Sequence, residues 1–419
     1  MTATATVTEP PTAATFWECR ESLTRILEFA RSRRAGPWAV LAAVLARAVA
    51  SVEPNVKLPP TVGAAASLNL FVAVVGPSGG GKGAAEGAAR DAVQFVDHTG
   101  RPLDDLAEFP VGSGEGIART FRPAGADADE ANERTRALFT IPEVDTIAAL
   151  GSRQGATLMP ELRKLYMGEQ LGFANGAKAT RSTLPAHSYR ASLVVGVQPL
   201  RAAALLHDAD GGTPQRFVWV PVGDPDAPDV APSPQPLIVR LPRWETKTVY
   251  LEVPEMARAA MDAHRLATLR GEAVDPLDGH RMLTRLKIAA ALMILDGRTV
   301  VDDEDWMLAG VVMRVSDRTR AGIERDLEEK ARRSNRARAE ARAEAEGIVA
   351  DRAAERLRER ARGRIVRTLE RRGTETRKGL RNNLDTPLRG VFDAVLSDLL
   401  EGAVIRESGG KFELVGVGG

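Results

Sequence analysis

A glycine-rich stretch at positions 76–83, GPSGGGKG, limits what this chain can fold into more than any other feature. An apolar run that predicts a β-strand precedes it, and a segment that predicts a helix follows it, AAEGAARDAVQFV at 84–96. A strand–loop–helix unit of this kind turns backbone N–H groups toward the loop and places the positive end of a helix beside them. The stretch therefore predicts an α/β core with a phosphate-binding loop.

The loop predicts ATP and Mg²⁺ as cofactors, with the Lys82 side chain on the β- and γ-phosphates. In the pattern GxxxxGK[ST] a hydroxyl residue that holds magnesium follows the lysine, but Gly83 stands there, and Ser78 lies elsewhere in the loop. A glycine-rich turn without a ligand is the weaker alternative, because glycines are costly in chain entropy. The expected nucleotide contacts are Gly76, Pro77, Ser78, Gly79, Gly80, Gly81, Lys82, Gly83 and Ala84.

The sequence has three other apolar runs, ALFTIPEVD, ASLVVGVQP and RFVWVPV. Polar residues stand at the ends of the first two. Such runs predict strands of a sheet that is covered on both faces. Glu143 is the expected catalytic base, and Asp145 is a carboxylate that could hold the metal through water. Gln198 could orient the attacking water, or it is only a turn amide. Pro142 stands where a metal-binding Asp is expected, so two metal positions, 83 and 142, are altered together. Either hydrolysis is slow or the metal is held through water and Asp145.

Composition excludes several classes of protein. The net charge of +1 means that any nucleic-acid-binding surface must be local, and the single cysteine, Cys19, excludes an internal disulfide framework. The five histidines are scattered, so the sequence predicts neither a metal centre nor a Ser/His/Asp arrangement. No signal peptide is apparent, and the most apolar stretch, 37–52, is short and interrupted by Arg47. We therefore expect a cytoplasmic protein without a membrane partner.

The C-terminal segment predicts three helices followed by a hairpin at Gly409–Gly410, which is the order of a winged helix. The third helix is expected to start with Thr386 as N-cap and Pro387 at its first position. Basic residues precede it, but its own side chains are poorly suited to reading bases, so we expect DNA binding mainly through phosphates. A protein–protein module is the alternative. The DNA-binding candidates here are Arg371, Arg372, Arg377, Lys378, Arg381 and Arg389.

A further set of DNA-binding candidates precedes the Gln198 strand, where glycines suggest a protruding hairpin: Lys178, Arg181 and Arg190. A plain surface loop is the alternative. Composition and periodicity divide the chain into a disordered leader 1–14, a helical segment 15–65, an α/β core 66–225, a connector with a strand pair 226–254, a helical domain 255–325, a charged solvated helix 326–362 and a winged helix 363–419.

Between about 37 and 320 the chain resembles a family of P-loop, AAA+-like proteins from bacterial phages and integrative mobile elements that includes replicative helicases. The resemblance is carried by SLNLFVAVVGPSGGGKG, IPEVD, VVGVQP, TPQRFVWVPV and LTRLKIAAALMILDG followed by DDEDW. The helical domain is similar to the lid of helicases of the minichromosome-maintenance type, which often precedes a winged helix. The resemblance implies a hexameric, DNA-dependent ATPase that acts as a replicative helicase or replication initiator, with other replication proteins as partners.

The same resemblance implies two further roles. Either Arg281 or Arg285 would be the lid residue that senses the γ-phosphate, and Arg216 would be an arginine finger supplied by the next protomer to Lys82 and Glu143. Two other functions remain open. One is a nucleotide-gated DNA-binding regulator or loader with little hydrolysis, and the other is a structural assembly protein that uses its winged helix for protein contacts.

Overall fold

The computed structural model describes residues 11–103, 106–121, 134–151, 157–173, 183–206, 208, 211–272 and 280–416. Most of the expected leader 1–14 lies outside these residues. The chain divides into an N-terminal unit, Met1–Glu328, and a C-terminal unit, Glu329–Gly419. Of the expected domain boundaries, only the one at 325/326 falls near this division.

A parallel five-stranded sheet forms the centre of the N-terminal unit, and its strand order is β4-β5-β6-β2-β7. Four of the strands were predicted from their apolar runs and are confirmed. The edge strand β4 was missed because its sequence, EFP, is short and contains proline. The strands are β2 (Phe71–Val75), β4 (Glu108–Pro110), β5 (Arg136–Ile141), β6 (Arg190–Val197) and β7 (Phe217–Pro221).

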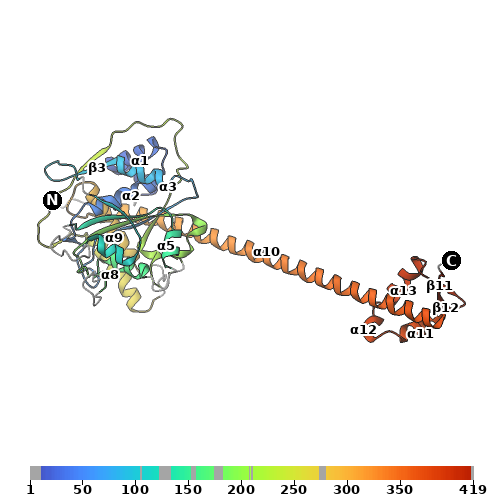
Figure 1. Ribbon diagram of the computed structural model, residues 1–419. Helices are drawn as coiled ribbons and strands as arrows, with labels where there is room; N and C mark the ends of the chain where they lie inside the picture. Colours follow the sequence, from blue (N-terminus) through green and yellow to red (C-terminus); the bar gives the residue numbers. More distant parts are fainter. Residues whose placement is uncertain are drawn as a thin grey trace. The chain divides into compact units, whose positions relative to one another are not determined.

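The two faces of the sheet belong to two apolar cores, which explains why its strands are apolar at nearly every position. On β2, Val72 and Val74 join one core and Phe71, Ala73 and Val75 the other. The first core includes α1, α2 and α3, which lie together on one side in Figure 1. These helices are α1 (Glu21–Ser32), α2 (Pro37–Ala50) and α3 (Lys82–Ala92), and those of the second core are α4 (Gly114–Phe121), α5 (Asp145–Gly151) and α6 (Leu158–Met167).

Helix α2 is apolar on all sides because it packs against α1, α3, α9 and the sheet. Its one charged residue, Arg47, donates to Glu108 Oε1 at 2.6 Å. No helix in the described residues is both long enough and apolar enough to cross a membrane.

The segment expected as a helical domain is helical and shares its core with α2. Lys287 of α9 is buried and donates to the carbonyls of Asn69 and Tyr166, which fixes α9 to the segment before β2 and to α6. The helices are α8 (Glu255–Leu269), α9 (Arg281–Leu295) and α10 (Asp303–Arg372), the last of which begins in the N-terminal unit and ends in the C-terminal unit.

Two expectations about local structure are wrong. The helix expected over 84–96 ends at Ala92, and the next four residues form a strand, β3, because β-branched and aromatic residues replace alanines there. The two strands expected to pair within 226–254 have other partners: β3 (Val93–Val96) pairs with β8 (Leu237–Arg240), and β1 (Val56–Lys57) pairs with β9 (Val249–Tyr250). The remaining short helices are η1 (Phe16–Glu18), η3 (Pro199–Arg201), α7 (Ala203–Leu206) and η4 (Pro214–Arg216).

The C-terminal unit has a core of its own, formed by residues between Ala361 and Phe412. Its sheet is antiparallel with the order β10-β12-β11. The hairpin turn expected at Gly409–Gly410 is confirmed, and both glycines have positive φ, as a tight hairpin turn requires. The elements are β10 (Thr374–Thr376), α11 (Arg377–Asn382), α12 (Thr386–Arg389), α13 (Phe392–Glu401), β11 (Ile405–Ser408) and β12 (Lys411–Leu414).

The helices of this unit differ from the expectation in two ways. The first is not a separate short helix but the end of the 70-residue α10, whose stretch 331–356 is exposed at every position. The third expected helix is interrupted at Gly390–Val391, which divides it into α12 and α13. Its N-cap is Asp385 and not Thr386.

Candidate functional site

The loop after β2 has the shape that its glycines predict. Gly79 and Gly81 have φ of 72° and 93°, a region that other residues rarely adopt. A Cβ on Gly80 would lie 2.8 Å from Pro77 Cδ, and a Cβ on Gly76 would lie 2.2 Å from Val222 Cγ2. The glycines therefore allow a narrow loop. A larger residue at position 79, 80 or 81 would strain this loop, and one at position 76 would clash with Val222, which follows β7.

The N-terminus of α3 opens directly onto this loop. Gly81 is the N-cap and offers no side-chain cap, and the first intrahelical bond runs from Ala85 N to Gly81 O at 2.9 Å. The N–H groups of Lys82, Gly83 and Ala84 consequently have no acceptor within the helix. Several inward N–H groups beside a positive helix end fit the oxygens of a di- or triphosphate.

Lys82 lies against its own loop. Its side chain is only 8% exposed, and Nζ donates to Gly76 O at 3.4 Å and Pro77 O at 3.2 Å. Nζ is also 3.6 Å from Glu143 Oε1. The lysine therefore joins the glycine-rich loop to the carboxylate that follows β5.

Strand β6 lies between β2 and β5, and this order brings the third group to the site. Because the strands are parallel, residues that follow them meet at one edge of the sheet. Gln198 follows β6, and its Nε2 donates to Glu143 Oε2 at 2.9 Å. The structure thus brings together three of the expected catalytic residues, Lys82, Glu143 and Gln198.

Gly196 makes this approach possible, and its importance was not recognised from the sequence. A Cβ on Gly196 would lie 2.1 Å from Pro142 O and 3.3 Å from Lys82 Cε. Val144 N donates to Gly196 O at 2.9 Å, which fixes the segment after β5 to β6. The available signal was a single glycine inside an otherwise apolar strand.

The residues that fit phosphates are not accompanied by residues that fit a magnesium ion. Position 83 has no hydroxyl and position 142 no carboxylate. Asp145 is exposed and 3.8 Å from Arg201 Nη1. Over the residues that the structure describes, no group of three or more His, Cys, Asp or Glu side chains could hold a metal ion.

The arginines expected to act on the γ-phosphate are not at this edge within one chain. Arg216 immediately precedes β7, so it lies at the opposite, amino edge of the sheet. Its Nη1 donates to the carbonyls of Gly211 and Gly212 at 2.9 and 2.6 Å, and its buried Nε has no partner among the described residues. Burial lowers its pKa.

The two lid candidates are also held on the amino-edge side. The start of α9 is fixed there, because Thr284 Oγ1 donates to Gln215 O at 3.2 Å. Arg281 pairs with Asp317 at 2.8 Å, and Arg285 lies over the Trp306 ring at 3.8 Å and donates to its carbonyl. Burial, with Arg314 and Arg281 nearby, lowers the pKa of Arg285 to about 10. The structure therefore does not bring Arg281 or Arg285 to Lys82 in the same chain.

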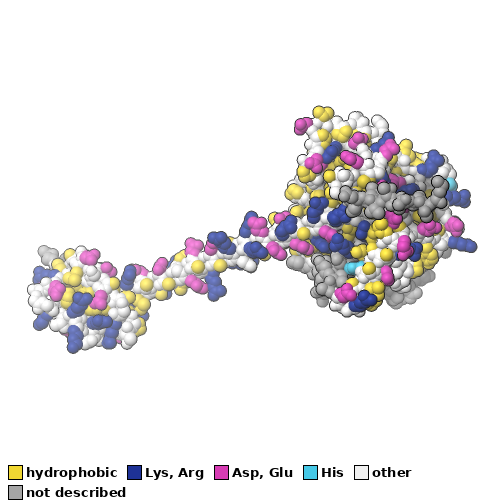
Figure 2. Space-filling model, turned by 180° about the vertical axis from the view of Figure 1, so that it is seen from behind, with side chains coloured by type: hydrophobic (Ala, Val, Ile, Leu, Met, Phe, Trp, Pro, Cys, Tyr) yellow, Lys and Arg dark blue, Asp and Glu magenta, His cyan; other side chains and the backbone are white. Residues whose placement is uncertain are grey.

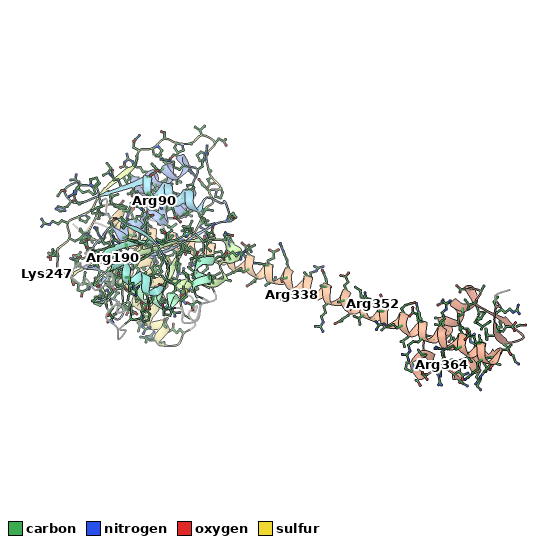
Figure 3. The ribbon with its side chains drawn as sticks, in the orientation of Figure 1. Arg90, Arg190, Lys247, Arg338, Arg352 and Arg364 are labelled. Atoms are coloured by element: carbon green, nitrogen blue, oxygen red, sulfur yellow. The ribbon has the colours of Figure 1, made fainter. Side chains whose placement is uncertain are left out.

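The expectation that Arg190 contacts DNA is wrong. Its side chain is fully buried inside the N-terminal unit, where Figure 3 labels it, and it donates to the carbonyls of Val52, Glu53 and Val56 and to Ser67 Oγ. A guanidinium that already binds five groups in the interior, Asn69 Oδ1 being the fifth, cannot reach a phosphate in solution. Burial was not visible in the sequence, where Arg190 only begins a strand. Lys178 and Arg181 lie outside the described residues.

All the basic candidates of the C-terminal unit are exposed. Three of them have local partners, since Arg372 pairs with Glu375, Arg377 pairs with Asp393 at 2.7 Å, and Arg389 donates to Leu384 O. Figure 2 shows Lys and Arg side chains at several points of this unit, interspersed with acidic ones. Arg381 lies close enough to Asp393 to help lower the pKa of that carboxyl. Arg371 and Lys378 have no such partner among the described residues.

The exposed side of α13 carries acidic side chains, including Asp393 and Asp398. These would repel a phosphate backbone, so the basic residues that precede them are better placed for DNA than α13 itself.

Comparison with known proteins finds no matching protein-family model and no matching curated protein sequence. The family resemblance carried by the sequence motifs therefore stays a prediction.

Proposed function

We propose that this chain binds a nucleoside triphosphate, with ATP as the expected nucleotide, at residues 76–84, and that it couples the nucleotide to DNA. The observation that carries the proposal is the meeting of Lys82, Glu143 and Gln198 beside the N-terminus of α3. A phosphate loop alone would serve binding. A carboxylate and an amide placed at its lysine add the groups that phosphoryl transfer to water requires.

In this proposal, the loop N–H groups and Lys82 bind the phosphates, and Lys82 exchanges its contacts with Gly76 O and Pro77 O for γ-phosphate oxygens. Glu143 accepts a proton from the water that attacks the γ-phosphorus, and ADP leaves. Gln198 holds the Glu143 carboxylate in position through its amide.

The C-terminal unit would supply the contact with DNA. The order of its elements supports a winged helix. The end of α10 is followed by β10 and α11, then by α12 and α13, and then by a two-stranded hairpin. Together the two parts support an ATP-dependent DNA-binding protein of the replicative helicase or initiator type. A hexameric ring, with Arg216 supplied by a neighbouring protomer, is the assembly that the resemblance implies.

A second candidate is a nucleotide-gated DNA-binding regulator or loader. The absence of side-chain metal ligands at positions 83 and 142 favours it, because a metal ion positioned by the protein assists phosphoryl transfer, whereas the loop and Lys82 can bind phosphates without it.

The two candidates differ in ATP turnover with DNA. We would compare steady-state hydrolysis with and without single-stranded and forked DNA in the wild type, Lys82→Ala and Glu143→Gln. DNA-stimulated turnover that both substitutions abolish supports the motor. ATP binding without turnover under any DNA condition supports the regulator, and a protein that binds no nucleotide would refute both.

A further inference from the structure

We infer that nucleotide binding at residues 76–84 is insensitive to magnesium, because this chain recognises the phosphates without a side-chain ligand for the metal. The inference rests on the proposed nucleotide site and concerns how that site works. It concerns binding affinity and not the rate of hydrolysis.

The first observation is the position after the lysine. Gly83 is exposed in the first turn of α3, where a side-chain hydroxyl would face the bound phosphates. A Cβ built on Gly83 meets nothing within 4 Å. A serine would therefore fit without strain, so the absence of the hydroxyl is not imposed by packing.

The second observation is the segment after β5. Pro142 is exposed and has no oxygen-bearing side chain, and its neighbour Glu143 is engaged by Lys82 and Gln198. Asp145 lies at the start of α5 and faces Arg201. Glu143 is thus engaged within the protein, and Asp145 is an exposed carboxylate 3.8 Å from Arg201 Nη1 that would reach a metal only through water.

The third observation is that the remaining groups neutralise phosphate charge without a metal. Lys82 carries a full positive charge, and α3 presents three N–H groups and its positive dipole end. A magnesium ion bound here would have phosphate oxygens and water as its ligands. Mg²⁺ retains several waters readily, so such an ion adds little to the affinity of the protein for the nucleotide.

The experiment measures the Kd of a fluorescent ATP analogue with excess magnesium and with EDTA, using the full chain. We expect the two values for the wild type to agree within about threefold. A loss of binding in EDTA of more than about tenfold overturns the inference while leaving the nucleotide site intact. No binding in either condition refutes the proposed function itself.

A double variant, Gly83→Ser with Pro142→Asp, restores both missing ligands. We expect magnesium to strengthen its binding by about tenfold or more relative to EDTA. The matched control, Gly83→Ala with Pro142→Ala, changes the same positions without adding oxygen, and its two Kd values should agree as in the wild type. Equal Kd values in the double variant, with its thermal unfolding unchanged, would contradict the assignment of these two positions.

Ser78 is the one hydroxyl in the loop and needs its own variant. Ser78→Ala should leave the ratio of the two Kd values unchanged. A magnesium dependence in the wild type that Ser78→Ala removes would overturn the inference and assign the metal to Ser78.

Discussion

Gly83, at the end of the glycine-rich loop, and Gly196, in β6, differ in the space around them, and this difference predicts opposite effects of the same substitution. Gly196→Ala places a methyl group 2.1 Å from Pro142 O, a backbone atom that cannot rotate away. We expect a loss of unfolding free energy of about 1–3 kcal/mol. Gly83→Ala meets open space on a helix and should be neutral or stabilising by about 0.5–1 kcal/mol. Urea unfolding of both variants checks this, and equal effects would contradict the geometry.

At Arg190 we predict a cost in stability without a cost in DNA affinity. Arg190→Gln removes the donor to the carbonyls of Val52 and Val56 and one of the two donors to the Glu53 carbonyl, which should reduce the unfolding free energy by about 3 kcal/mol. DNA binding by the folded variant should match the wild type in affinity and salt dependence. A reduced salt dependence with unchanged stability would restore Arg190 as a DNA contact.

His280 predicts a pH dependence of stability. Burial, with Arg216 and Lys287 nearby, lowers its pKa from 6.5 to about 4. The unfolded chain therefore binds a proton more readily, so the stability from this residue is present above pH 6.5 and is lost as the pH falls toward 4. We expect the difference in unfolding free energy between the wild type and His280→Gln to change by roughly 1 kcal/mol per pH unit in this range. A difference that does not vary with pH would contradict the burial of this ring.

At the scale of elements, the strands of the sheet were predictable because both faces are buried, which makes their sequences continuously apolar. The same runs placed Glu143 and Gln198 at one edge. The partners of β3 and β9 were not predictable, because each pairs with a strand more than a hundred residues away and the sequence of a two-residue strand carries no signal of its partner. The burial of Arg190 depends on Val52, which follows α2, and on Val56 of β1, both far from it in sequence.

The proposed DNA contact of the C-terminal unit can be tested at two exposed basic residues of α11. Lys378→Ala and Arg381→Ala remove exposed charges near β10 and α11, and each should weaken DNA binding and reduce the slope of log K against log salt by about 0.9. Arg352→Ala removes an exposed charge from α10, labelled in Figure 3, and serves as the control. Fluorescence anisotropy over a range of salt concentrations provides the measurement. Equal slopes in all variants would favour a protein–protein role for this unit.

At the scale of the whole molecule, the C-terminal unit should fold alone, because every residue of its apolar core lies within the unit. We expect a fragment covering 353–419 to unfold cooperatively by circular dichroism. Leu369→Ala, which removes a buried side chain of this core, should destabilise the fragment by about 2–4 kcal/mol. A non-cooperative transition in the wild-type fragment would show that the core needs the rest of the chain.

The central claim, that residues 76–84 form a nucleotide site, is tested most directly by isothermal titration calorimetry of ATP into the full chain. The wild type and Lys247→Ala, which changes an exposed lysine remote from the loop in sequence and labelled in Figure 3, should bind one ATP per chain with the same Kd. Lys82→Ala should bind at least about tenfold more weakly, with unchanged thermal unfolding. No heat of binding in the wild type, or equal Kd values in all three proteins, would contradict the account.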